Sequence, residues 1–215
     1  MLLNPSHLEH ESILASLTSA RPYFTGTVLD LGCGDQPYSA IIRKGVAAYI
    51  GTDISLAHTP PPDVCSDSLE LPFKNNSFDT VVSTQVIEHV RNPFAMMYEI
   101  ARVLKPRGHV VLTAPQLWPL HEEPYDFFRY TKYALELLAN QHGLDVVYIK
   151  ERGGAIAALG QMISILLYDR FAKGAFQRAL TKCICVPLLY GCGMLDRLWF
   201  NPKLTLGYVM VARKP

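Results

Sequence analysis

The sequence predicts an α/β protein with a doubly wound parallel sheet, and three observations support this prediction. Apolar and β-branched runs alternate with helical patterns along most of the chain. A two-glycine turn follows the first run, and Asp53 ends the second run. That arrangement places a nucleoside against the carboxyl end of a parallel strand. The predicted strands are residues 28–31, 46–54, 79–84, 109–114, 144–149 and 206–212.

The 215 residues suit a single domain, because a chain of this length can bury roughly 70% of its unfolded surface. We expect an N-terminal helical segment at 1–25 and a cofactor-binding core at 26–150. An apolar helical insertion at 151–203 and a closing strand at 204–215 would complete the domain.

The turn at Gly32 and Gly34 suits a ligand without a pyrophosphate. Glycine takes positive φ at little cost and has no Cβ, so the backbone can approach a ligand closely. A dinucleotide-binding turn carries a third glycine three residues later, where this chain has Pro37. Asp30 and Asp35 place negative charge on both sides of the turn, which favours a sulfonium or ammonium group.

The turn resembles the first motif of the class I S-adenosylmethionine-dependent methyltransferases, in the branch called type 11. Segments 67–73, 77–82, 87–90 and 101–108 continue the resemblance in order. It implies S-adenosyl-L-methionine as cofactor and a Rossmann-like sheet of seven strands whose last strand, 206–213, is antiparallel. By the same resemblance, Asp53 would hold the ribose hydroxyls, Asp67 would face the adenine amino group, and the 30–34 turn would hold the methionine end. The expected cofactor-binding residues are Asp30, Gly32, Cys33, Gly34, Asp53, Ile54, Asp67, Ser68, Thr84 and Gln85.

Two helices are predicted between the later strands. Residues 131–142 begin at a Thr131 cap and end at Gly143. Residues 93–104 begin at Asn92 and Pro93, and a stop signal follows at Pro106 and Gly108. The apolar stripe predicted for this second helix contains Phe94, Met97, Ile100, Ala101 and Leu104.

The loop at 115–131, after the fifth predicted strand, contains the candidate catalytic groups. His121 is the predicted general base, because an unperturbed imidazole titrates at about pH 6.5. Glu122 or Asp126 would orient it, and Arg129 would bind a substrate carboxylate or phosphate through its planar fork. The alternative is a packed loop that an Asp126–Arg129 pair ties down.

Glu88 and His89 follow the fourth predicted strand. They are weaker catalytic candidates, because a histidine at a helix start usually has a structural role.

Composition and the N-terminal sequence argue against nucleic-acid binding, a metal site and export. The net charge of +1, without a basic run that carries interleaved aromatics, argues against nucleic-acid binding. Five cysteines without a paired framework indicate reduced thiols, and Cys183, Cys185 and Cys192 lack a fourth ligand, so we expect no metal. The N-terminus lacks the basic flank and apolar core of a signal peptide, so we expect a cytoplasmic protein.

The insertion is unusually apolar. Its stretches at 153–168 and 183–195 are shorter or more interrupted than the roughly 20 residues that span a bilayer. The basic residues between them, opposed only by Asp169, are Arg170, Lys173, Arg178 and Lys182. This pattern fits a helical pair peripheral to an anionic membrane or covering a lipid-linked substrate. An ordinary helical cap, on the sheet or in a homodimer, explains it equally well.

The sequence thus predicts a methyltransferase that acts on an oxygen of a small-molecule, glycan or lipid-linked acceptor. Two alternatives stay open. One is a noncatalytic protein that keeps the cofactor fold and binds a membrane or protein partner. The other is a nicotinamide-dependent oxidoreductase, which Pro37 disfavours.

Overall fold

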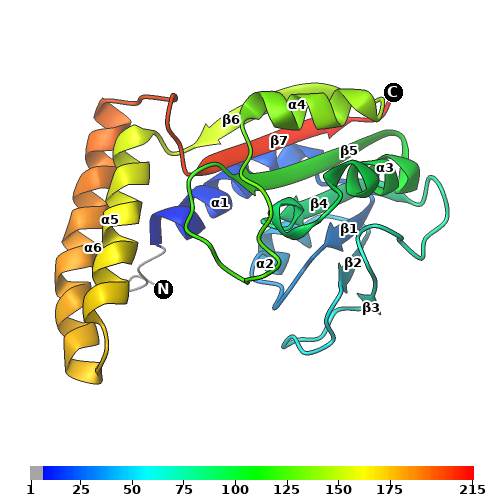
Figure 1. Ribbon diagram of the computed structural model, residues 1–215. Coiled ribbons are helices and arrows are strands. Elements are labelled where there is room, and N and C mark those ends of the chain that lie inside the picture. Colours follow the sequence, from blue (N-terminus) through cyan, green and yellow to red (C-terminus); the bar gives the residue numbers. More distant parts are fainter. Residues whose placement is uncertain (1–6) are drawn as a thin grey trace.

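A computed structural model describes residues 7–215 and shows one sheet with helices on both faces (Figure 1). The seven strands lie in the order β3-β2-β1-β4-β5-β7-β6, which confirms the predicted fold class. The strands are β1 Thr27–Leu31, β2 Ala48–Asp53, β3 Val64–Cys65, β4 Phe78–Thr84, β5 Leu104–Pro115, β6 Asp145–Arg152 and β7 Gly207–Arg213. The helices are α1 His7–Ala20, α2 Ser39–Ile42, α3 Pro93–Val103, α4 Lys132–Gln141, α5 Ala155–Phe171 and α6 Ala175–Leu198, with short 3-10 turns η1 Arg21–Tyr23 and η2 Ile87–His89.

The core has two layers, one on each face of the sheet. Neighbouring strand residues point to opposite faces, so Leu29 and Val110 pack with α3 and α4. Val28 and Val111 pack with α1 and α2. Because helices cover both faces, the central strands read as nearly continuous apolar runs in the sequence.

The last strand is antiparallel, as predicted. β7 pairs with β5 through Val111 and Val211, and with β6 through Ile149 and Met210, in both cases antiparallel. The strand that closes the chain therefore lies inside the sheet, between the two strands that precede it in sequence.

The structure corrects the boundary between α3 and β5. The predicted stop at Pro106 and Gly108 lies inside β5, which begins at Leu104 directly after the helix. A Cβ on Gly108 would come within 2.9 Å of the carbonyl oxygen of Lys105, so a tight backbone approach requires glycine there. Leu104 pairs with Phe78 of β4, so β5 begins before the predicted strand at 109–114.

The apolar stripe of α3 is also shifted by about one residue. Phe94 is 44% exposed, whereas Met96 and Val103, which the stripe omitted, are buried. Positions 93, 96, 97, 100 and 103 share the i, i+3, i+4 spacing that faces the sheet.

At the N-terminus, α1 occupies His7–Ala20 of the expected 1–25 segment. Residues 1–6 of that segment lie outside the described part of the chain.

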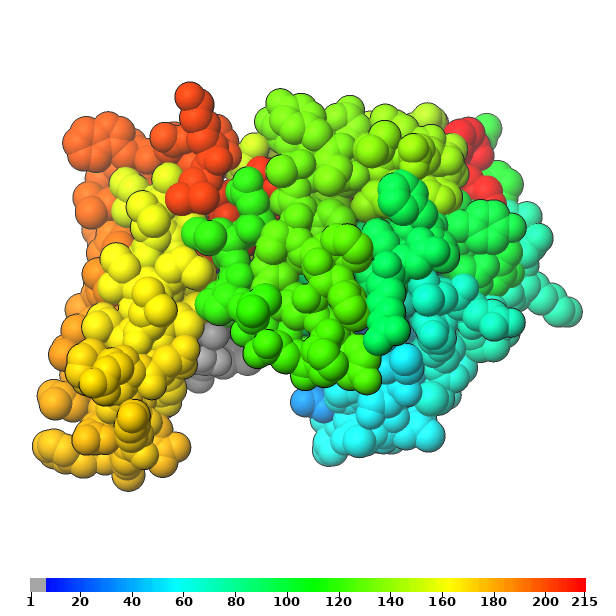
Figure 2. Space-filling view, in the orientation of Figure 1, coloured from blue at the N-terminus to red at the C-terminus, as the bar shows by residue number. Residues whose placement is uncertain are grey.

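α5 and α6 form a hairpin that projects from one end of the sheet (Figures 1 and 2). The Asp196 carboxylate near the end of α6 accepts hydrogen bonds from the backbone N–H groups of Gly154, Ile156 and Ala157, at 2.7–3.2 Å. A Cβ on Gly160 would lie 2.5 Å from the Cys192 sulfur, so this glycine allows the two helices to pack closely.

The expectation that the second apolar stretch is interrupted is wrong. α6 continues through Pro187 as one helix of 24 residues. By length and composition it can cross a membrane, and only 22% of its most apolar window is buried.

Candidate active site

A cavity of about 680 Å³ lies at the carboxyl ends of the parallel strands. Loops that follow β1, β2, β3, β4 and β5 all contribute to its wall, as expected for a sheet of this type. Nine of the ten predicted cofactor residues line it: Gly32, Cys33, Gly34, Asp53, Ile54, Asp67, Ser68, Thr84 and Gln85.

The glycine turn brings bare backbone to the cavity wall. Gly32 and Gly34 have φ values of +72° and +50°, which side-chain-bearing residues rarely adopt. A Cβ on Gly32 would come within 2.3 Å of Val86. A Cβ on Gly34 would have only His58 near it, at 4.0 Å, so the turn leaves room for a ligand.

Asp53 joins the turn to the end of β2. One carboxylate oxygen accepts a hydrogen bond from the Gly34 N–H at 3.0 Å, and the other accepts one from the Ser55 N–H at 3.0 Å. These bonds aim the carboxylate at the cavity wall, where a ribose would lie. The acceptor oxygens of Asp53 and the open space above Gly34 fit S-adenosylmethionine.

His58 is a site residue that sequence reasoning missed. Its Nδ1 lies 3.1 Å from Asp35 and its Nε2 lies 3.3 Å from Asp53. A hydrogen bond from the Thr59 N–H, and a second from His58, hold the pKa of Asp35 below its usual range. The only sequence signal was a histidine beside the proline cluster that follows β2.

Asp30 does not line the cavity. It is buried in β1, where the Tyr49 hydroxyl donates a 2.6 Å hydrogen bond to it. Burial raises the pKa of Asp30 to about 6. Asp30 therefore cannot contact a bound cation directly, and its charge could act on one only across the glycine turn that follows β1.

Cys33 acts as a packing residue. Burial, with the negative charges of Asp30 and Asp53, raises the pKa of the thiol to about 12. Asp67, by contrast, lies at a loop surface, and its carboxylate accepts a hydrogen bond from the Leu69 N–H at 2.9 Å.

The loop between β5 and α4 is tied to η2. The backbone N–H groups of Phe127 and Phe128 donate to the Glu88 carbonyl, and the Tyr130 hydroxyl donates to the Ile87 carbonyl. This brings Glu122, Tyr125 and Phe127 to the cavity wall, none of which was predicted to line it.

Asp126 organises this loop. Its side chain is 1% exposed and accepts bonds from both terminal nitrogens of Arg129, at 2.6 and 2.8 Å. It also accepts a bond from the His121 backbone N–H at 3.0 Å, and His121 Nδ1 lies 3.2 Å away. The Arg129 guanidinium holds the pKa of Asp126 well below its usual range.

Arg129 does not fit the expected role of binding a substrate. Its remaining bonds go to the carbonyl oxygens of Trp118, Pro119 and Phe128, so all its N–H groups have partners within the loop. The alternative, in which the Asp126–Arg129 pair ties the loop down, describes this geometry.

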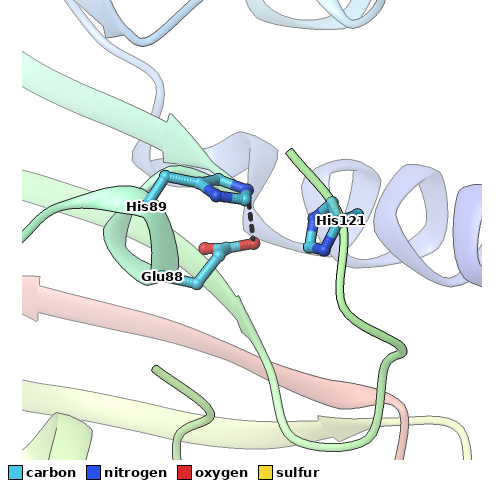
Figure 3. A group of neighbouring side chains, drawn as sticks. All are labelled: Glu88, His89 and His121. Carbon is cyan, nitrogen blue, oxygen red and sulfur yellow. Dashed lines mark ion pairs between the residues drawn. The ribbon is translucent and has the colours of Figure 1, made fainter. Parts of the chain in front are cut away.

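Glu88 and His89 occupy η2, beside the loop. Glu88 is fully buried, and burial raises its pKa to about 8. His89 lines the cavity, with its ring 4.6 Å from the His121 ring (Figure 3). The structure therefore brings His121 close to Glu88 and His89, the pair that the sequence ranked below it. His121, Asp126 and Arg129 do not themselves line the cavity.

Comparison with known proteins agrees with this arrangement. Residues 29–112 match the family model described as a methyltransferase domain. The demethylmenaquinone methyltransferase of Corynebacterium kroppenstedtii is 34% identical over 91 residues, which cover 40% of this chain and 40% of that protein. The chain thus spans about two-fifths of the length of the curated relatives it matches.

Solved structures share the fold over nearly the whole chain. A SAM-dependent methyltransferase from Archaeoglobus fulgidus has a TM-score of 0.60 and 20% identity, covering 95% of this chain and 94% of that one. The Haemonchus contortus phosphoethanolamine N-methyltransferase 2, in complex with S-adenosyl-L-methionine, has a TM-score of 0.58 and 21% identity. That match covers 96% of this chain and 52% of the other.

Proposed function

Since the chain belongs to the class I S-adenosylmethionine-dependent methyltransferase family, we propose that it transfers the methyl group of this cofactor to an oxygen atom. The proposed acceptor is a small molecule, a glycan or a lipid-linked compound. The observation that carries the proposal is one cavity whose wall joins the glycine turn and Asp53 to the loop that follows β5.

The proposed cofactor contacts follow the order of the strands. Asp53 would accept hydrogen bonds from the ribose hydroxyls with the lone pairs that Gly34 and Ser55 leave free. Asp67 and Ser68 would lie at the adenine end, and the glycine turn with Thr84 and Gln85 at the methionine end.

The chemistry asks little of the protein, because the sulfonium carries a good neutral leaving group. Alignment of acceptor and cofactor supplies most of the rate, and an alcohol acceptor also needs a base. We assign that base to His121, with Asp126 as the residue that positions it through Nδ1. Arg129 then acts only by fixing Asp126.

Isothermal titration with S-adenosylhomocysteine tests the cofactor assignment. We expect saturable binding by the wild type, at least tenfold weaker binding by Asp53→Ala, and no change in Asp145→Asn, an exposed aspartate far along the sheet. NAD serves as the competing ligand. Binding of NAD in preference to S-adenosylhomocysteine would restore the oxidoreductase alternative, which family membership disfavours.

The noncatalytic alternative differs in turnover. Transfer of radiolabelled methyl groups to extracted lipids, glycans or small molecules would exclude it. Loss of transfer in His121→Ala, with S-adenosylhomocysteine binding retained, would support His121 as a residue of the reaction. Unchanged transfer would remove His121 from the mechanism.

We also propose that the protein is cytoplasmic and that the hairpin places it against an anionic membrane. Leu166, Phe176 and Leu180 are 68%, 81% and 56% exposed. The basic residues near the hairpin tip, Arg170, Lys173, Arg178 and Lys182, supply charge that attracts anionic headgroups. A lipid-linked acceptor would then lie near the enzyme.

Co-sedimentation with phosphatidylserine vesicles tests this contact. We expect the wild type and Leu137→Asp, a matched change on exposed α4, to pellet equally. Leu166→Asp with Phe176→Asp should stay in the supernatant. Equal pelleting of all three proteins would show that the hairpin is not the membrane contact. A wild-type dimer that the double variant abolishes would make the hairpin a dimer interface instead.

A further inference from the structure

We propose that Glu88, His89 and His121 form a binding site for a divalent first-row transition-metal ion at the edge of the cofactor cavity. One ligand atom from each residue lies within 4.8 Å of the others. Figure 3 shows the Glu88 carboxylate directed toward the space between the two imidazole rings. Two imidazoles with one carboxylate are a ligand set typical of Zn²⁺, Fe²⁺ and related ions. The proposal departs from the expectation, drawn from the cysteines, that the chain has no metal site.

The hydrogen-bond partners of the two imidazoles occupy Nδ1 and leave Nε2 for an ion. His89 Nδ1 lies 2.9 Å from the carbonyl oxygen of Tyr125, and His121 Nδ1 lies 3.2 Å from a carboxylate oxygen of Asp126. Because these partners only accept hydrogen bonds, the proton of each neutral ring belongs on Nδ1 and the lone pair on Nε2. A carbonyl or carboxylate at the other ring nitrogen is the usual support of a metal-binding histidine.

Glu88 supplies a second, independent observation. Its side chain is fully buried, yet neither carboxylate oxygen has a hydrogen-bond partner among the described residues. His89 Nε2 lies 4.0 Å from the nearer oxygen, which is too far for a hydrogen bond. A buried polar group without a partner is costly, and a cation held between Glu88 and His89 would provide one.

The site can close around an ion with small movements. Two donor atoms that each lie about 2.1 Å from one ion can be at most about 4.2 Å apart, so the widest separation must shorten. His121 lies on a loop with its side chain 31% exposed, which leaves room for that shift. Glu122 is a further acidic group nearby, with a carboxylate oxygen 3.9 Å from His89 Nε2 and a side chain 71% exposed.

An ion at this position would stand beside the reacting groups. His89 and Glu122 both line the cavity, so an open coordination position could accept an oxygen of the acceptor. A hydroxyl bound to a divalent ion ionises more readily. With an ion bound, His121 would be a ligand, and the ion would supply the activation of the acceptor hydroxyl that is otherwise assigned to His121. Metal binding itself does not depend on the proposed methyl transfer.

Titration of the metal-free protein with Co²⁺, followed by visible absorption, tests the proposal. We expect a band that saturates at one equivalent and disappears when Zn²⁺ displaces Co²⁺. Glu88→Gln and His121→Asn, which keep side-chain shape, should each weaken Co²⁺ binding by at least about tenfold. His142→Asn is the matched control, because His142 bonds to the Leu138 carbonyl at the end of α4, away from the site, and should bind Co²⁺ normally.

A wild type without a saturable Co²⁺ band overturns the proposal, as does unchanged Co²⁺ affinity in the two variants. If buried Glu88→Gln fails to fold, His121→Asn on the exposed loop decides alone. Titration of the same metal-free samples with S-adenosylhomocysteine keeps the two proposals distinct. Cofactor binding without Co²⁺ binding removes only the metal site, and Co²⁺ binding without cofactor binding removes only the proposed function.

Discussion

The start of the glycine turn is held by backbone atoms, whereas the α5–α6 hairpin is held by side chains. The N–H groups of Gly32 and Cys33 both donate to the Thr52 carbonyl, at 2.8 and 2.9 Å, and leave little freedom of residue choice in the turn. The hairpin buries Cys185 and Leu189 but exposes residues such as Phe176 and Leu198 over most of its surface. In the turn, the backbone conformation limits which residues fit. In the hairpin, only the buried positions, or positions that a binding partner covers, limit the choice of residue.

The junction of the two regions should show the largest effect. Arg152 ends β6 with a fully buried side chain and bonds to Glu9 of α1 at 2.7 Å. Arg152→Met leaves the Glu9 charge unpaired, so the free energy of unfolding should fall by about 3–5 kcal/mol. Arg170→Met, an exposed arginine of the hairpin, should change it by less than about 0.5 kcal/mol. Urea denaturation measures both, and equal effects would contradict a stability difference between junction and hairpin.

The pH dependence of stability should report Asp30 in the cofactor half. Its folded pKa of about 6 lies above the ordinary aspartate value of 3.8. The folded state therefore binds the proton more tightly, and this group lowers the free energy of unfolding as pH rises from about 4 to about 6. Asp30→Asn removes that loss and should be more stable than the wild type above pH 6, by up to roughly 3 kcal/mol.

Denaturation series between pH 4 and pH 7 check this expectation. Asp145→Asn, an exposed substitution, should follow the wild-type profile. Parallel profiles for the wild type and Asp30→Asn would show that burial does not perturb Asp30.

The glycine turn should be sensitive in both stability and binding. Gly32→Ala puts a Cβ 2.3 Å from Val86 at a φ of +72°, so we expect loss of S-adenosylhomocysteine binding and about 2–3 kcal/mol of stability. Gly143→Ala has a similar φ of +67° with no atom within 4 Å of the new Cβ, and should cost about 1 kcal/mol with binding unchanged. Titration and thermal unfolding of both variants separate the clash from the backbone strain.

The smallest effect on stability should come from the outer surface of the hairpin. Phe176→Asp changes a side chain that is 81% exposed, so the free energy of unfolding should move by less than about 0.5 kcal/mol. Leu189→Ala in the same hairpin empties a fully buried position and should cost about 2–5 kcal/mol. If Phe176→Asp proved as destabilising in thermal unfolding, Phe176 would have to be covered by another molecule or by a second copy of the chain.

The sequence predicted most of the fold because its signals are local. Apolar runs and the glycine turn placed β1, β2, β4 and most of β5, and the caps at Asn92 and Thr131 placed two helices. The two-residue parallel strand β3 was not predicted. The resemblance supplied the antiparallel last strand. The insertion was predicted to be helical, but the continuity of α6 was not, because Pro187 removes one helical hydrogen bond. Buried Thr181 and Leu189 lie on either side of Pro187 along the helix.

The candidate site was predictable on the cofactor side only. Asp53 and the glycines are tied to fixed positions after their strands, so spacing finds them. The partners of Arg129, the position of His58 between two aspartates, and the unpaired carboxylate of Glu88 arise from residues far apart in the chain. No local pattern carries that information.

The antiparallel pairing of β6 and β7 makes the hairpin a replaceable module. Arg152 and Gly207, where the chain leaves and rejoins the sheet, lie opposite each other in neighbouring strands. A tight turn could join such strands directly, so the segment between them can change in length and composition without altering the register of the sheet. An engineer could thus exchange the hairpin of this chain while the strands beneath the glycine turn keep their places.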